Sequence, residues 1–301
     1  MTQLRAWVSA FRLRTLPLAL SSIIMGGFLA AFYGSFSWAV LLWASLTTLF
    51  LQVLSNLAND YGDTVNGADH AGRQGPQRMV QAGLIAPKRM KVAIVLFVLF
   101  SFISGIALII TAFQTLQQMG SLLFFVVGLL AIAAAMKYTM GKNPYGYNGL
   151  GDLFVLLFFG LVGVGGSFYL HHHRVEWEVV LPALSVGLLS SGVLNLNNMR
   201  DEQSDTQAGK RTLVVKNGLL WAKRYHFILI ITAMLCSLVF VLVQTFCWPH
   251  YLFILSLPLF IRHLSVVRHA VTAENFDPEL KKLALSTLLY VILFGSGLVM
   301  C

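Results

Sequence analysis

Long apolar runs dominate this chain, and short polar connectors separate them. A helix needs about 20 consecutive, mainly apolar residues to cross the hydrocarbon core of a bilayer. Nine runs of that kind occur, at roughly 16–34, 38–58, 91–113, 120–138, 150–170, 179–199, 225–246, 249–270 and 282–300. They lack the alternation of apolar and polar residues that a membrane β-strand requires. The pattern therefore predicts an all-α, polytopic membrane protein with nine transmembrane helices.

Composition and charge agree with this fold class and distinguish the two membrane faces. The chain is 57% hydrophobic and 11% charged, whereas a soluble domain carries about 25% charged residues. Of its 21 lysines and arginines, all but Arg174 fall in the N-terminal segment and the even-numbered connectors. The positive-inside rule then predicts a cytoplasmic N-terminus and an external C-terminus. Because this topology accounts for the net charge of +9, no nucleic-acid partner is expected.

Two acidic clusters stand where apolar runs end, both on the predicted cytoplasmic side. The first lies in SNLANDYGDTVNGAD and contains Asn56, Asn59, Asp60, Asp63 and Asp69. The second lies in NLNNMRDEQSD and contains Asn197, Asn198, Asp201 and Asp205. Spacings of three and four residues return to one helix face, so each cluster can aim its side chains at one point. Carboxylates are costly near hydrocarbon, which makes both clusters candidates for function.

Basic residues follow each cluster and indicate what it binds. Arg73 and Arg78 follow the first cluster, and Lys210 and Arg211 follow the second. Mg2+ is commonly held by one or two carboxylates together with substrate phosphates, and arginine pairs well with phosphate oxygens. The pattern predicts facing sites for Mg2+ and a diphosphate. The expected catalytic and metal-binding carboxylates are Asp60, Asp63, Asp201 and Asp205.

Two other interpretations compete with this one. The clusters can be solvated helix caps and loop charges, although two clusters at matched spacing on one face argue against it. They can also belong to an ion-coupled transporter, which uses intramembrane carboxylates and internal repeats. Transporter carboxylates usually lie in mid-helix, whereas these lie near helix ends and precede basic residues. Phosphate chemistry is therefore favoured.

An internal repeat accompanies the clusters. Asn56-x3-Asp60 matches Asn197-x3-Asp201 at a separation of 141 residues, but Thr64 stands where the second copy has Asp205. This predicts one domain, 1–301, built from two weakly related halves at about 1–140 and 141–301.

Three further features complete the candidates. In the segment 136–154, Tyr138 and Lys142 can reach a diphosphate, and Asp152 can lie near an aromatic co-substrate. The tract His171–His173 sits in an external connector without partner ligands. The three cysteines have no metal-ligand spacing, so small apolar side chains within helices are the simplest interpretation of them. No nucleotide-binding glycine motif stands between a strand and a helix.

Four stretches resemble the UbiA superfamily of intramembrane aromatic prenyltransferases. They are FRLRTLPLALSSIIMGG (11–27), the block from Asn56 to Arg78, NPYGYNGLGDLFVLLFFG (143–160) and NNMRDEQSDTQAGKRTLVV (197–215). The paired aspartate motifs are typical of the superfamily. The Arg-Thr-Leu-Pro start, the Asn-Asp-Tyr-Gly-Asp block and the Gly-Tyr-x-Gly-Leu-Gly block are similar to the branch that acts on 1,4-dihydroxy-2-naphthoate.

The resemblance implies a helical bundle around a central cavity in a bacterial inner membrane, with the active site on the cytoplasmic side. It implies Mg2+-dependent transfer of a chain from a polyprenyl diphosphate to 1,4-dihydroxy-2-naphthoate, with loss of carbon dioxide, giving demethylmenaquinone. 4-Hydroxybenzoate or another aromatic acceptor is the alternative. The implied site residues are Asn56, Asp60 and Asp63 (first metal motif), Asp201 and Asp205 (second), and Arg73, Tyr138 and Lys142 (diphosphate). Thr64 departs from the common superfamily acid, so Asp63 or Asp69 is expected to replace it, and Arg14 is a candidate for the aromatic carboxylate.

Overall fold

A computed structural model describes residues 2–68 and 77–301, and these residues form helices and short connectors, with no strand among them. Nine helical segments of this described part are long and apolar enough to cross a membrane: Gln3–Phe32, Trp38–Val65, Pro87–Phe113, Met119–Lys137, Gly151–His172, Trp177–Arg200, Leu219–Val243, Trp248–His269 and Ala273–Val299. The predicted number and order of spans are confirmed.

The helices are α1 (Gln3–Phe11), α2 (Leu16–Phe32), α3 (Trp38–Val65), α4 (Pro87–Phe113), α5 (Met119–Lys137), α6 (Gly151–Val155), α7 (Ser167–His172), α8 (Val180–Arg200), α9 (Glu202–Gln207), α10 (Leu213–Asn217), α11 (Leu219–Val243), α12 (Leu257–His269) and α13 (Ala273–Val299). A π-helical stretch, η3 (Leu156–Gly166), joins α6 to α7, and a 3-10 stretch, η5 (Trp248–Ser256), precedes α12.

Several helices extend beyond the apolar runs that predicted them. The run at 38–58 belongs to a helix that continues to Val65, and the last helix begins at Ala273 instead of near 282. An apolar run marks only the part of a helix that lies in hydrocarbon, whereas the backbone hydrogen bonds continue into the polar end. The first acidic cluster therefore lies on a helix from Asn56 to Asp63, which fixes the relative directions of its side chains.

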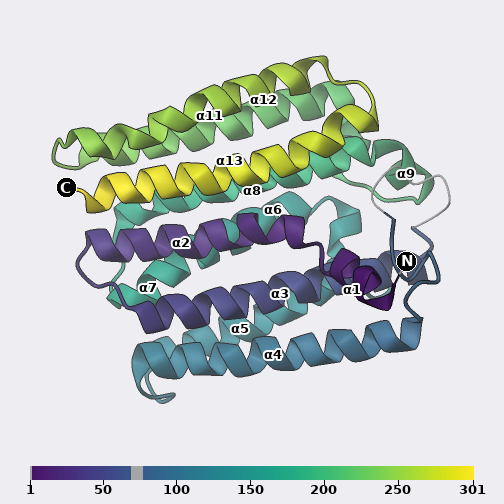
Figure 1. The fold of residues 1–301 in the computed structure, drawn as a ribbon, viewed down its shortest axis with the longest axis horizontal. Helices are drawn as coiled ribbons and strands as arrows, with labels where there is room; N and C mark the ends of the chain where they lie inside the picture. Colours follow the sequence, from purple (N-terminus) through teal and green to yellow (C-terminus); the bar gives the residue numbers. More distant parts are fainter. Residues whose placement is uncertain (1, 69–76) are drawn as a thin grey trace.

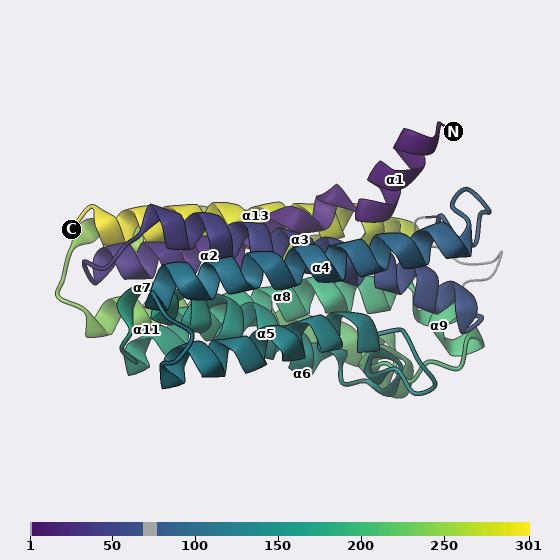
Figure 2. The ribbon, with the colours of Figure 1, turned by 90° about the horizontal axis from the view of Figure 1, so that it is seen from below.

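The spans pack side by side, and consecutive spans run in opposite directions (Figure 1). α13 packs against both α2 and α8, while α3 packs against α4 and α11 packs against α8. The two termini lie at opposite ends of the bundle, as an odd number of spans requires (Figure 1). α1 tilts away from the bundle at the end that also carries α9 (Figure 2). We call this the polar end, because both acidic clusters lie there.

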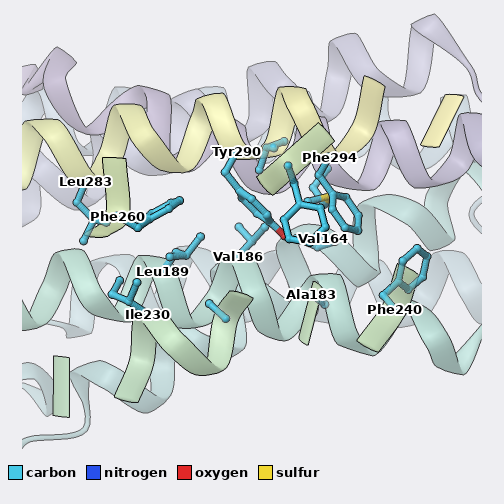
Figure 3. Packing of buried hydrophobic residues seen from close by; sticks show 14 of the residues in the cluster. Val164, Ala183, Val186, Leu189, Ile230, Phe240, Phe260, Leu283, Tyr290 and Phe294 are labelled. Carbon is cyan, nitrogen blue, oxygen red and sulfur yellow. The ribbon is translucent and has the colours of Figure 1, made fainter. Parts of the chain in front are cut away.

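Buried aromatic and branched side chains fill the space between α8, α11 and α13 (Figure 3). In their midst, the hydroxyl of Tyr290 lies 2.9 Å from Ser185 Oγ and 2.5 Å from Ser237 Oγ. These three residues come from α13, α8 and α11, so one hydroxyl network joins three spans. Elsewhere the helices approach closely at glycine: a Cβ at Gly160 would lie 2.7 Å from Ala183 O. In a membrane no hydrophobic driving force holds one helix against another, and small residues let the helix backbones pack closely instead.

The cysteines correct one interpretation. Cys247 and Cys301 form a disulfide across 54 residues of sequence, so the reading of them as simple apolar residues was wrong. Cys236 is free, in line with that reading. The disulfide ties the C-terminal end of α13 to the start of η5, at the end of the bundle opposite the polar end.

Candidate active site

A cavity of about 440 Å³ lies within the bundle and joins the two acidic clusters to an apolar interior. Its polar wall includes Asn59, Asp63, Asp201, Asp205 and Lys210. Its apolar wall includes a group of aromatic side chains from α4, α5 and the fifth span: Phe102, Phe124, Phe125, Phe154, Phe158 and Phe159. The cavity is thus charged at one end and apolar along its length.

The first cluster divides into residues that face the cavity and one that does not. Asn56, Asn59 and Asp63 line the cavity, whereas Asp60 is not part of its wall. At 100° per residue, Asn59 and Asp63 fall on one side of Asn56 and Asp60 falls on the other. The Asp60 carboxylate is 1% exposed and accepts the backbone N–H groups of Met79 and Val80, each at 2.9 Å. Asp60 therefore anchors the segment after the first cluster to α3.

Asn56 faces the cavity but is occupied by the N-terminal segment. Its amide donates to Phe11 O at 2.9 Å and to Thr15 Oγ1 at 3.0 Å. Asn59 is held differently, because its Oδ1 accepts the hydroxyl of Thr139 at 3.0 Å. Asn59 is therefore the amide of this cluster that lies beside Asp63, which follows it by four residues on the same helix.

Asp63 is a carboxylate of the first cluster with three side-chain partners among the described residues. It is 2% exposed and pairs with Arg78 Nη2 at 2.5 Å. Its other oxygen accepts the hydroxyl of Tyr147 at 2.7 Å and lies 3.3 Å from Lys210 Nζ. Arg78, Tyr147 and Lys210 come from three segments, so the Asp63 carboxylate gathers two cations and a hydroxyl donor at one point of the site.

The second cluster is organised by Arg200. Its guanidinium binds both oxygens of Asp201 at 2.8 Å, and its Nη1 donates to Asp277 Oδ1 at 2.7 Å. Nη2 of the same guanidinium donates to Asn197 Oδ1 at 2.8 Å. Asn197, Asn198 and Asp201 all line the cavity. Arg200 therefore fixes the end of α8 against α13 and sets the position of Asp201.

Asp205 lies one helical turn after Asp201 and contacts Lys210 Nζ at 3.2 Å. Burial raises the pKa of Asp205 to about 6, although Lys210 acts in the opposite direction. Burial lowers the pKa of Lys210, but Asp63 and Asp205 together outweigh it and the pKa is raised, so its ammonium is charged. The Lys210 ammonium thus contacts one carboxylate from each cluster.

The other predicted residues divide between the cavity and the surface. Tyr138 lines the cavity, and burial raises its pKa, so it is a neutral phenol. Lys142 and Arg211 are exposed and are not part of the cavity wall. Asp152 also lies outside the wall and accepts the hydroxyl of Tyr225 at 3.2 Å. The predictions on Asp69 and Arg73 fall outside the described residues.

The sequence-based prediction missed Arg12, Tyr147 and Lys281 among others. These three residues line the cavity, as does the predicted Arg14. Tyr147 stands in the Gly-Tyr block that was noted, but nothing in the sequence showed that its hydroxyl meets Asp63. Lys281 shares a wall with Leu280 and Ala284 of α13. The sequence placed Lys281 in a connector, because the apolar run of that helix begins only at 282.

Gly62 permits the close packing that holds Asn59 in place. A Cβ at Gly62 would lie 2.8 Å from the backbone carbonyl of Thr139, the residue whose hydroxyl binds Asn59. We expect Gly62→Ala to cost about 1–3 kcal/mol of stability, because overpacking forces the backbones apart, and to displace the Asn59 side chain. Thermal unfolding of the purified protein measures the first effect. Gly165→Ala, where a Cβ meets nothing within 4 Å, is the control, and equal losses in both variants would contradict the argument.

The donor atoms around the cavity fit a divalent metal. Asn59, Asp63, Asp201 and Asp205 present amide and carboxylate oxygens to one wall, and oxygen ligands are the ones that Mg2+ prefers. The Lys210 ammonium lies within 3.3 Å of a carboxylate from each cluster, so a cation position between the clusters exists in the structure itself.

Comparison with known proteins agrees with the geometry. The model of the UbiA prenyltransferase family matches residues 19–293. A protein of Haemophilus influenzae called 1,4-dihydroxy-2-naphthoate octaprenyltransferase is 44% identical over 298 residues, 98% of this chain and 96% of that protein. An Escherichia coli protein of the same name is 42% identical over 98% of this chain and 95% of its own length.

Solved structures share the fold. A UbiA homolog from Aeropyrum pernix K1 aligns with a TM-score of 0.69 at 14% identity, covering 96% of this chain and 98% of the other. A UbiA homolog from Archaeoglobus fulgidus bound to DMAPP and Mg2+ aligns with a TM-score of 0.62 at 15% identity, with the same coverage. With the family model matched over nearly all its spans, this multi-pass membrane protein belongs to the UbiA prenyltransferase family.

Proposed function

We propose that this protein transfers a polyprenyl chain from a polyprenyl diphosphate to 1,4-dihydroxy-2-naphthoate, with loss of carbon dioxide, giving demethylmenaquinol, the reduced form of demethylmenaquinone. The choice of acceptor rests on one observation: sequence identity of 42–44%, along nearly the whole chain, to proteins named for that activity. The cavity supports the reaction class, because a charged end for a diphosphate continues into an apolar interior for a prenyl chain.

The charged end is proposed to bind the diphosphate. Asn59, Asp63, Asp201 and Asp205 would hold Mg2+, with Asp60 as the anchor of the following segment instead of a ligand. Bound Mg2+ would neutralise charge that develops on the departing diphosphate. Lys210, Arg78 and the Tyr138 phenol supply further donors at the same end, and preorganised donors of this kind stabilise a leaving anion. The exposed side chains of Lys142 and Arg211 are not assigned a role.

The apolar wall is proposed to protect the reacting carbons. The bond between the allylic carbon and the diphosphate oxygen breaks, and its electron pair leaves with the diphosphate. The ring carbon that bears the carboxylate then attacks the allylic cation. Carbon dioxide departs from that carbon, and the electron pair of the broken bond restores the aromatic ring. The phenylalanines exclude water, which would otherwise capture the cation.

We also propose the orientation in the membrane. The polar end would face the cytoplasm of a bacterium and the C-terminus the outside of the inner membrane, since all lysines and arginines but Arg174 lie on one side of the predicted topology. The disulfide at the opposite end supports this orientation, because disulfides persist in oxidising compartments. The division of one domain into two related halves stays a prediction.

An assay with competing acceptors tests the function. Membranes that contain the protein are expected to convert 1,4-dihydroxy-2-naphthoate and a polyprenyl diphosphate into demethylmenaquinol, which is detected as demethylmenaquinone after oxidation by air, and to stop when a chelator removes Mg2+. Membranes without the protein are the control, and mass spectrometry of extracted lipids is the measurement. Product formed only from 4-hydroxybenzoate would show that the proposed acceptor is wrong, while membership of the family would stand. Ion uptake by reconstituted vesicles, with neither acceptor prenylated, would favour a transporter.

A further inference from the structure

Lys210 occupies a position that links the two acidic clusters. Its ammonium lies 3.3 Å from Asp63 Oδ1 and 3.2 Å from Asp205 Oδ1, and its side chain is only 13% exposed. It also lies over the ring of Tyr147, 4.8 Å from the centroid, and the hydroxyl of that ring binds Asp63. A cation buried among two carboxylates and an aromatic face is held by the site and is not a mobile surface charge.

We infer that Lys210 is a built-in competitor of the divalent metal: it bridges Asp63 and Asp205 when diphosphate is absent and yields them when metal and diphosphate arrive together. The inference rests on the proposed function and extends it. It makes metal binding depend on diphosphate, so that the two acidic clusters take up metal chiefly as part of the substrate complex.

The local structure allows the ammonium to move while its backbone stays in place. The Lys210 N–H donates to Asp205 O at 2.9 Å, and the next N–H, of Arg211, donates to Tyr147 O at 2.7 Å. Gly209 takes the left-handed conformation, with φ +71, that closes this turn after α9. The four-carbon stem of lysine carries a compact charge on rotatable bonds. The ammonium can therefore leave the carboxylates for a nearby phosphate oxygen without unfolding the turn.

The two carboxylates differ in what remains when Lys210 is removed. Asp63 keeps Arg78 and the Tyr147 hydroxyl. Within the described part of the chain, Asp205 has no ion-pair partner other than Lys210. A neutral side chain at 210 thus leaves Asp205 open to a metal ion and removes the positive charge that opposes it.

Metal affinity measured without and with diphosphate tests the inference. The purified full-length protein, in detergent or lipid nanodiscs, is titrated with Mg2+ by calorimetry, first alone and then with inorganic diphosphate at known free Mg2+. We expect Lys210→Met to bind Mg2+ alone more tightly by roughly 5- to 150-fold, the usual range of coupling between two sites. The gain that diphosphate gives to Mg2+ affinity is expected to shrink by the same factor.

Lys281→Met is the matched control, because Lys281 also lines the cavity but, among the residues that the structure describes, forms no ion pair with either cluster. It is expected to change Mg2+ affinity by no more than about twofold, since an exposed charge interacts weakly through water. Unchanged or weaker Mg2+ binding in Lys210→Met, or an equal gain in Lys281→Met, would overturn the inference. Lys210→Gln serves if the methionine variant does not fold. Because the readout is metal affinity, failure to prenylate naphthoate would refute the proposed function and leave this result standing.

Discussion

Replacing Asp63 by Asn is expected to lower the rate of prenyl transfer by at least about 10³-fold. Loss of a single preorganised group that stabilises a developing charge already costs about 10²–10³ in rate. The substitution would remove a metal ligand and also the carboxylate that positions Arg78 and Lys210. Product formation per minute per molecule of purified protein, at saturating diphosphate and acceptor, measures the effect.

Asp152→Asn is the matched control for this experiment. Asp152 is a buried aspartate of the same bundle, 8% exposed, but it lies outside the cavity wall and bonds to Tyr225. We expect its substitution to leave the rate within a few-fold of the parent, because it touches neither cluster. If Asp63→Asn kept a rate near that of Asp152→Asn, the assignment of Asp63 to the metal site would be abandoned.

Replacing Asp60 by Asn is expected to lower the stability of the fold without removing a metal ligand. Both carboxylate oxygens accept buried backbone N–H groups, of Met79 and Val80, and an amide can satisfy only one of them. The unsatisfied donor costs about 1–3 kcal/mol. The rate is expected to fall as well, because Arg78 precedes these two residues and its position against Asp63 depends on them.

The two variants are separated by measuring unfolding and metal affinity on the same samples. Asp60→Asn is expected to unfold at a lower temperature yet bind Mg2+ within about threefold of the parent when folded. Asp63→Asn is expected to lose Mg2+ binding. Loss of Mg2+ binding in Asp60→Asn at an unchanged unfolding temperature would return Asp60 to the role of ligand that the sequence suggested.

Hydropathy predicted the number of spans correctly because hydrocarbon demands apolar residues over a fixed length, whatever the tertiary contacts. It placed helix ends poorly at the polar end, where α3 runs on to Val65 and α13 starts at Ala273. These extensions lie outside hydrocarbon, so no apolar run marks them.

Helical periodicity located the acidic clusters but did not resolve their members. Spacing alone put Asp60 on one face with Asn56 and Asp63, and it could not show that the Asp60 carboxylate binds the backbone of Met79 and Val80. The same limit applies to Tyr147, Lys210 and the pair Cys247–Cys301, whose contacts join segments far apart in sequence. Long-range contacts of this kind leave no local pattern of residues.

The hydroxyl network of Ser185, Ser237 and Tyr290 bears on how the active site is assembled. Transmembrane helices insert singly and then associate, and between apolar helices many sliding positions have similar energies. A slide of one turn, about 5.4 Å, would break the bonds of the Tyr290 hydroxyl to both serines. The network therefore selects one axial alignment of α8 with α13. That alignment brings Arg200 level with Asp277 at the polar end, so three buried hydroxyls between the helices set the height of the metal site.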